Sequence, residues 1–324
     1  MLDILLLCAA MLVGFLILFK SADEFVVGSI ATAKNISVSP MIIGLTIVAL
    51  GTSAPEIFVA ITSSLQGEAH LAVGNAIGSN IANVGMVLGI TALIIPLRFK
   101  VELLREDIPI LIFVTVCCGI ALVDFKLDIW DGLLLFFGLA LFLWRLVSEK
   151  GKSSEIPPEI EELVEIPEIT TKQGVIRLII SLLFLLASAE LLVWSAINIA
   201  QSLGVSELVI GLTIIAVGTS LPELMVSLAS SLKGQTDLAI GNIVGSNIFN
   251  ILAVLSIPCI LAPTEVGPQV FWRDYLVMLL LTAALIFFAV GKNKERKISR
   301  IKGALLLAIW LGYLITLYNT AIAS

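Results

Sequence analysis

Two glutamates lie in the middle of apolar segments of this chain. Glu56 and Glu223 each end the motif Gly-Thr-Ser-x-Pro-Glu, at 51–56 and 218–223. The threonine and the serine precede the glutamate by four and three residues, so in a helix all three side chains share one face. Carboxylate and hydroxyl oxygens are the ligands that hard cations such as Ca²⁺ prefer. The motif therefore indicates a cation site, whose hydroxyl ligands would be Thr52, Ser53, Thr219 and Ser220.

The charge of these glutamates needs a partner inside a membrane. A carboxylate at the bilayer midplane costs several kcal/mol unless positive charge matches it, and neither apolar segment contains a lysine or arginine next to its motif. Glu56 and Glu223 together carry the charge that one Ca²⁺ cancels. The alternative, a protonated glutamate that makes a helix contact, explains a single copy better than two symmetric ones.

The proline of each motif adds a main-chain ligand. Proline in a helix removes one hydrogen bond and clashes with the preceding turn, so Pro55 frees the carbonyl of Gly51 and Pro222 frees that of Gly218. In hydrocarbon a freed carbonyl must find another partner. A bound cation is one such partner.

A second motif, Gly-Asn-x-x-Gly-Ser-Asn-Ile-x-Asn, follows at 74–83 and 241–250. Its polar residues recur every fourth position and form a stripe along a helix. The stripe supplies either cation ligands or hydrogen bonds between helices. The candidate ligands in it are Ser79, Asn83, Ser246 and Asn250. Asn80 and Asn247 are turned off the stripe and are predicted to join helices.

Both motifs belong to one internal repeat. Residues 38–90 align without gaps to 205–257, and about 30 of the 53 positions are identical. Duplication explains such self-similarity. Each half is predicted to hold five apolar spans, and an odd number inverts the second half in the membrane. Inverted repeats place their substrate at the repeat interface, near the bilayer midplane.

The composition requires lipid as the solvent. Of the 324 residues 59% are hydrophobic and 14% charged, and the mean hydropathy is +1.09, whereas soluble domains average about 25% charged residues. Nothing in the charge pattern suggests nucleic acid, and the four cysteines are read as small core residues. Ten transmembrane helices are expected, at 3–19, 39–65, 70–96, 106–124, 128–147, 175–200, 206–232, 238–262, 272–291 and 302–320.

The polar segments set the expected domains and topology. Residues 1–148 form the first five-helix repeat, 149–173 an acidic, proline-containing linker, and 174–324 the second, inverted repeat. If the N-terminus is outside, 17 of the 19 basic residues fall on the inner side, as the positive-inside rule requires. The protein is thus expected to be a multi-pass plasma-membrane protein with both termini outside and a cytoplasmic linker.

The paired motifs resemble the two repeats of the calcium/cation antiporter superfamily, in particular prokaryotic sodium/calcium exchangers. The resemblance implies ten helices and alternating access, in which the first and sixth helices slide past the other eight. It implies a central Ca²⁺ bound by Glu56 and Glu223 with the main chain and hydroxyls of Thr52 and Thr219. It implies flanking Na⁺ sites at Ala49, Ser53, Ser79, Ala216, Ser220 and Ser246, with Asn83 and Asn250 at the remaining polar positions. Some members have an aspartate at one of these two positions, and this chain has asparagine at both.

These features predict an antiporter that exchanges Ca²⁺ for Na⁺ at a midplane site. Hydroxyl ligands suit Na⁺ and have no evident use for a proton. An antiporter of H⁺, or of another cation, with Ca²⁺ is the alternative, and a cation channel is a less favoured one. We expect no enzymatic activity, no catalytic residues, no cofactor and no obligate protein partner, because the chain shows no paired nucleophile and base.

Overall fold

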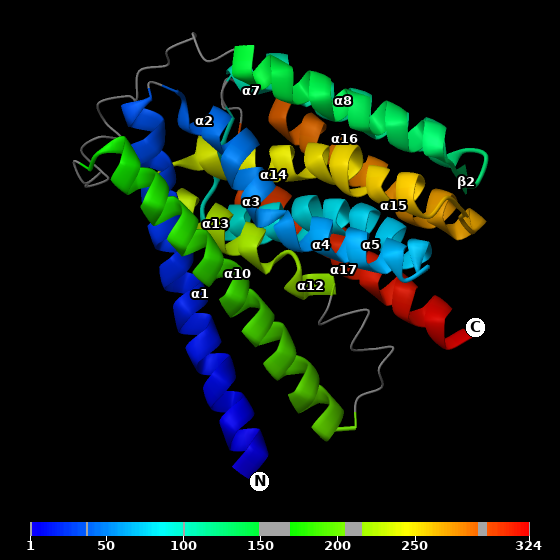
Figure 1. Cartoon of the computed structure of the whole chain (residues 1–324), viewed down its shortest axis with the longest axis horizontal. Coiled ribbons are helices and arrows are strands. Elements are labelled where there is room, and N and C mark those ends of the chain that lie inside the picture. Colours follow the sequence, from blue (N-terminus) through cyan, green and yellow to red (C-terminus); the bar gives the residue numbers. More distant parts are fainter. Residues whose placement is uncertain are drawn as a thin grey trace.

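The computed structural model describes residues 2–36, 38–99, 101–148, 169–204, 216–290 and 297–323, and these are almost entirely helical (Figure 1). The first half contains α1 (Leu2–Asn35), α2 (Pro40–Ile43), η1 (Gly44–Val48), α3 (Ala49–Thr52), α4 (Ala54–Leu65), α5 (Ala69–Ala82), η2 (Asn83–Leu88), α6 (Gly89–Ile94), β1 (Leu97–Arg98), α7 (Val101–Leu122), β2 (Lys126–Leu127) and α8 (Ile129–Ser148). Segments labelled η are π-helical, with one wider turn inside a longer helix.

The second half repeats this order from the end of the linker onward. It contains α10 (Thr171–Ser202), α12 (Ala216–Gly218), α13 (Leu221–Leu232), α14 (Thr236–Phe249), η5 (Asn250–Val254), α15 (Ser256–Leu261), β3 (Thr264–Glu265), η6 (Val270–Tyr275), α16 (Leu276–Val290), β4 (Lys297–Ile298) and α17 (Arg300–Ala323). Most of the predicted linker, 149–168, and the start of the span predicted at 206–232 lie outside the described residues.

The chain is an all-helical polytopic membrane protein. Seven described helices are long and apolar enough to cross a bilayer, and an eighth span results if the bent pair Pro40–Thr52 and Ala54–Leu65 is counted as one. The prediction of ten spans includes two that this number leaves out. The span predicted at 106–124 falls in α7, whose start carries the three consecutive charges Arg105, Glu106 and Asp107. The start of the span predicted at 206–232 lies outside the described residues, so only its later part, which includes the 12-residue α13, is described.

The first helix is longer than predicted. The expected span ended at residue 19, whereas α1 continues to Asn35. Asp23 and Glu24 lie beyond the predicted end of the span. In the structure both charges are paired, Asp23 with Lys233 at 2.6 Å and Glu24 with Arg177. Ion pairing with basic side chains is the usual way in which a membrane helix carries such charges.

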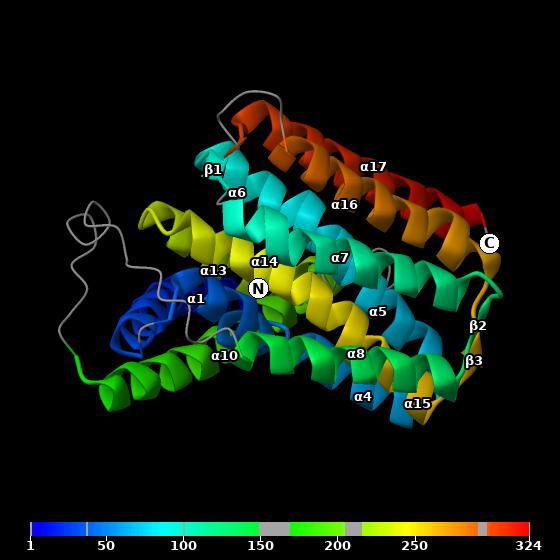
Figure 2. The ribbon, with the colours of Figure 1, turned by 90° about the horizontal axis from the view of Figure 1, so that it is seen from above.

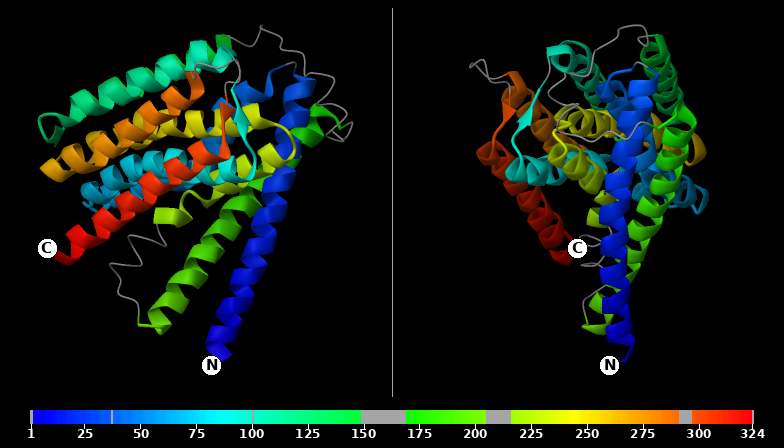
Figure 3. Two further views of the ribbon diagram at one scale, coloured as in Figure 1. Left: turned by 180° about the vertical axis from the view of Figure 1, so that it is seen from behind. Right: turned by 90° about the vertical axis from the view of Figure 1, so that its left-hand side faces the viewer.

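Two spans form the centre of the molecule. The windows in α5–α6 and α14–α15 are 78% and 83% buried, against 17–33% for the other candidate spans. The pair α1 and α10 lies at one side, and its lower ends project away from the other helices (Figures 1 and 3). These two helices approach closely where both lack side chains: a Cβ on Gly28 would lie 2.9 Å from the Leu178 nitrogen, and one on Gly174 2.8 Å from the Thr32 hydroxyl.

Two short antiparallel ladders join the halves crosswise. β1 pairs with β4, with Leu97 opposite Ile298, and β2 pairs with β3, with Leu127 opposite Thr264. The ladders lie at opposite ends of the helices (Figure 2). Lys126 and Glu265 add an ion pair of 2.8 Å to the second ladder. Each ladder joins two loops that the predicted alternation of spans places on the same side of the membrane.

Candidate functional site

Both glutamate motifs fold as broken helices. In the first, α3 ends at Thr52 and α4 begins at Ala54, and the two parts of the span are bent by 42°. In the second, α12 ends at Gly218 and α13 begins at Leu221. The proline stands in the first turn of the following helix in both cases, where its missing N–H costs no hydrogen bond. The helix breaks predicted from the prolines are confirmed.

The break determines where each carboxylate lies. Glu56 and Glu223 are in the first turns of α4 and α13, where the exposed N–H groups of the helix favour negative charge. Glu56 is 1% exposed and Glu223 is fully buried. Among the described residues neither forms an ion pair with a basic side chain. The site therefore holds two buried acidic groups that are stabilised by helix N–H groups and not by a basic side chain of the described residues.

The two motifs meet across the repeat interface. The Ser53 hydroxyl donates to Oε1 of Glu223 at 3.3 Å, so a residue of the first motif serves the glutamate of the second. The Thr52 hydroxyl donates to Oδ1 of Asn242 at 3.1 Å, and Nδ2 of Asn242 donates to the main-chain oxygen of Glu223 at 3.4 Å. Glu56 lies near enough to Glu223 for the two carboxylates to interact electrostatically.

The polar stripe of each second motif also faces this centre. Ser79 lies beside the Glu56 carboxyl and Ser246 beside that of Glu223. Nδ2 of Asn75 donates to the main-chain oxygen of Glu56 at 3.3 Å, which fixes the first turn of α4. Asn75 and Asn242 are thus repeat-equivalent supports of the two glutamates, a role that the stripe alone did not identify.

Many buried polar atoms of the site have no hydrogen-bond partner among the described residues. They are Oε2 of Glu56, Oε2 of Glu223, the hydroxyls of Ser220 and Ser246, and both amide atoms of Asn83 and of Asn250. An unsatisfied buried polar group costs about 1–3 kcal/mol, and more if it is charged. Oxygen atoms predominate in this set. The donor set therefore fits a hard cation that binds as substrate.

The remaining sequence candidates are placed as follows. Ala49 is buried at the start of α3, Thr219 is half-buried between α12 and α13, and Ala216 is the first residue of α12. Asn80 and Asn247 face each other instead of the site: Nδ2 of Asn80 donates to the main-chain oxygen of Asn247 at 3.3 Å, and Nδ2 of Asn247 donates back at 3.5 Å. The prediction that these two asparagines join helices is confirmed.

A π-helical turn begins at each site asparagine. Asn83 begins η2 and Asn250 begins η5, and such turns recur at functional sites because they rotate side chains off the regular helical spacing. Sequence reasoning missed them, since the residues around them follow the same apolar pattern as an ordinary helix. The sequence signal that could have directed attention to these turns is that both begin at equivalent asparagines of the internal repeat, Asn83 and Asn250.

Comparison with known proteins agrees with this geometry. The family model described as "Sodium/calcium exchanger protein" matches residues 6–147 and 173–319. The chain is 46% identical over 311 residues to "Putative antiporter CaxA" of Alkalimonas amylolytica, covering 95% of this chain and 98% of that protein. It is 36% identical over 318 residues to "Inner membrane protein YrbG" of Escherichia coli K12, covering 97% of each.

A solved structure gives the same result for the fold. The sodium-calcium exchanger NCX_Mj superposes with a TM-score of 0.82 at 32% sequence identity, over 96% of this chain and 99% of that one. The family match covers both halves and both pairs of motifs. The chain therefore belongs to the sodium/calcium exchanger protein family, whose members are transporters and not enzymes.

Proposed function

We propose that this protein exchanges Ca²⁺ for Na⁺ across the membrane, with both ions bound between Glu56 and Glu223. One observation carries the proposal: two buried carboxylates share a centre with unpartnered hydroxyl and amide oxygens, and no basic side chain among the described residues neutralises them. The site needs positive charge from outside the protein. The similarity to NCX_Mj, a sodium-calcium exchanger, supports the choice of these two ions.

The proposed ligands divide by ion. Glu56 and Glu223 hold Ca²⁺ with oxygens of Thr52 and Thr219. The flanking Na⁺ ligands are Ala49, Ser53, Ser79, Ala216, Ser220 and Ser246. Asn83 and Asn250 occupy the remaining polar positions of the site. The hydroxyls of Ser220 and Ser246 support this division, because both are buried without a hydrogen-bond partner among the described residues, and Ser246 lies beside the Glu223 carboxyl.

The proposed architecture is ten helices in two inverted repeats, in the plasma membrane with both termini outside and 149–173 cytoplasmic. The reciprocal Asn80–Asn247 bonds and the crosswise ladders support a twofold relation between the halves.

Alternating access then follows from sliding of α1 and α10. In this structure α1 packs along α13, whereas the repeat-equivalent packing of α10 on α4 is largely absent among the described residues. This asymmetry in the packing of α1 and α10 supports a movement of the two helices relative to the rest of the protein.

Ca²⁺ uptake into Na⁺-loaded vesicles is expected at equal pH on both sides. Two ionised glutamates cannot return empty through a low-dielectric site. Three Na⁺ would exceed their charge by one, so exchange would move one net charge and respond to voltage by about 2.3 kcal/mol per 100 mV. The measurement is Ca²⁺ uptake at a series of imposed potentials.

The rival counter-ion predicts a different response. Two protons would neutralise the glutamates and make exchange indifferent to voltage. Uptake that ignores the Na⁺ gradient but follows an imposed pH gradient would replace the sodium proposal with the proton one. Unitary currents in planar bilayers would instead favour a channel.

Replacement of residues 153–168 by a Gly/Ser linker of equal length is expected to preserve Ca²⁺ flux. The segment is rich in glutamate and proline, a composition that favours a solvated connector. The two halves are also joined by contacts outside it, through the two ladders. The flux of the replaced protein in vesicles, normalised to inserted protein, checks this. A correctly inserted variant with no flux would give the acidic run a further role.

A further inference from the structure

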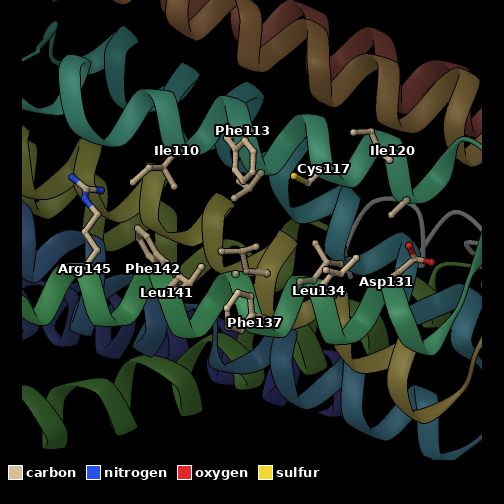
Figure 4. A pocket seen from close by; sticks show the side chains of 15 residues that line it. Ile110, Phe113, Cys117, Ile120, Asp131, Leu134, Phe137, Leu141, Phe142 and Arg145 are labelled. Carbon is tan, nitrogen blue, oxygen red and sulfur yellow. The ribbon is translucent and has the colours of Figure 1, made fainter.

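We infer that a hydrocarbon chain of a membrane lipid occupies a cleft between α7 and α8. The cleft has a volume of about 510 Å³ and is lined by 15 residues. The helices α7 and α8 are consecutive, yet they are not packed together along their lengths. Figure 4 shows side chains of both helices pointing into the space between them, among them Phe113 and Cys117 from α7 and Leu134 and Phe137 from α8.

The lining of the cleft selects an apolar occupant. Only Asp131 and Arg145 among the lining residues are charged, and they lie at its two ends (Figure 4). Water is not stable in an apolar space of this kind, and a void would forfeit the dispersion contacts of every lining side chain. Phe113 and Phe137 are 67% and 60% exposed. These rings border the cleft at the surface that meets lipid.

The ends of the cleft are closed, so its occupant enters sideways. At one end Arg145 of α8 binds Asp107 and Glu106 of α7, at 3.1 and 3.5 Å. At the other end β2 joins α7 to α8 and is held by its pairing with β3. The open side lies within the transmembrane part of α8. Access from the membrane favours a molecule that is already dissolved in it.

The width of the cleft distinguishes a lipid chain from a protein helix. Asp131 and Arg145 are separated by about 21 Å along α8 at 1.5 Å per residue. All the empty space in and in front of the cleft is about 1230 Å³, which over this length gives a mean cross-section of at most about 60 Å². A helix with side chains, about 10–12 Å across, needs roughly 80–110 Å². The cleft therefore admits an extended hydrocarbon chain but not a helix of a second copy.

The floor of the cleft connects it to the candidate ion site. Leu252 of η5 lines the cleft and is 4% exposed. It follows Asn250, the first residue of η5, by two positions. A Cβ on Gly138 of α8 would lie 3.1 Å from the Leu252 side chain, so α8 and η5 are in direct contact there. A lipid chain in the cleft would complete the packing around this π-helical turn.

The test is photocrosslinking in vesicles made with a phospholipid that carries a diazirine within its acyl chain, with adducts mapped by mass spectrometry. In the wild-type protein we expect several-fold more adducts on residues that line the cleft than on Leu12 and Leu16 of α1. Those two leucines are 68% and 69% exposed and line neither this cleft nor the apolar pocket of about 450 Å³ that lies between α1 and α10. Equal labelling of both surfaces would overturn the inference.

Two variants sharpen the result. Cys117→Trp fills the cleft and is expected to lower cleft adducts several-fold, whereas Val116→Trp, at a neighbouring 45% exposed residue that does not line it, leaves them unchanged. Leu141→Ala widens the cleft and is expected to keep or raise the yield, which guards against misfolding of the filled variant. Equal yields in Cys117→Trp and Val116→Trp, or crosslinks that join two copies at this face, would defeat the proposal.

Discussion

Replacing Glu223 by glutamine is expected to abolish Ca²⁺ transport, and Glu56→Gln is expected to do the same. Glutamine keeps the shape of the side chain and removes half of the charge that offsets the ion. Loss of one partner of a buried charge pair costs about 3–5 kcal/mol, which weakens binding by about two to four orders of magnitude. The measurement is the apparent Ca²⁺ affinity for uptake by each variant in vesicles.

Thermal unfolding with and without Ca²⁺ separates loss of the site from loss of the fold. A ligand that binds only the folded state raises the unfolding temperature, so the wild-type protein should show a Ca²⁺-dependent increase and both variants should lose it. Without cations each variant should be at least as stable as wild type, because one uncompensated buried charge is gone. Glu68→Gln, at an exposed residue, is the matched control. Near wild-type affinity in either Glu→Gln variant would refute the proposed site.

Gly245→Ala is expected to be the most damaging single-methyl addition near the site. An added Cβ would lie 2.8 Å from the Ala49 Cβ and 2.9 Å from the Cα and the main-chain oxygen of Leu45. Because two of these atoms are backbone, α14 and η1 must separate. Ser246 and Ala49, both candidate ligands, would move apart with them. Overpacking of this kind costs about 1–3 kcal/mol.

The control for this prediction is Gly312→Ala in α17. Gly312 has nothing within 4 Å of an added Cβ among the described residues and is exposed, so alanine there should be neutral or stabilise the helix by up to about 1 kcal/mol. Unfolding temperature and Ca²⁺ uptake of the two variants give the comparison. If Gly245→Ala matched Gly312→Ala in both, the close approach of α14 to η1 would not matter for the site.

Sequence reasoning located the chemistry of the site better than its geometry. The prolines predicted the helix breaks, and the repeat predicted two equivalent buried glutamates. The same-face argument, however, placed Ser53 beside Glu56 of its own motif, and in the structure Ser53 donates to Glu223. The reason is local: Ser53 has φ −83° and ψ 8°, which is not helical. The regular helical spacing therefore does not predict where the Ser53 side chain points.

Features that depend on distant partners had no sequence signal. The ladders consist of two residues per strand, too few for an alternating pattern to be recognised. Where α1 continues past its predicted end, Asp23 is paired with Lys233, which is far along the chain. The length of α1 and the crosswise joining of the halves thus follow from tertiary contacts, and neither composition nor periodicity records them.

The crosswise ladders impose an order on biogenesis. Leu97 of β1 must wait for Ile298 of β4, about 200 residues later, and ribosomes add about 5–20 residues per second. For some 10–40 s the newly inserted first half therefore keeps an unpaired strand, and Asn80 lacks its partner Asn247. During this interval the nascent half depends on the insertion machinery or on chaperones to shield its polar groups. Chains that are truncated between residues 150 and 297 should consequently be degraded by membrane proteases.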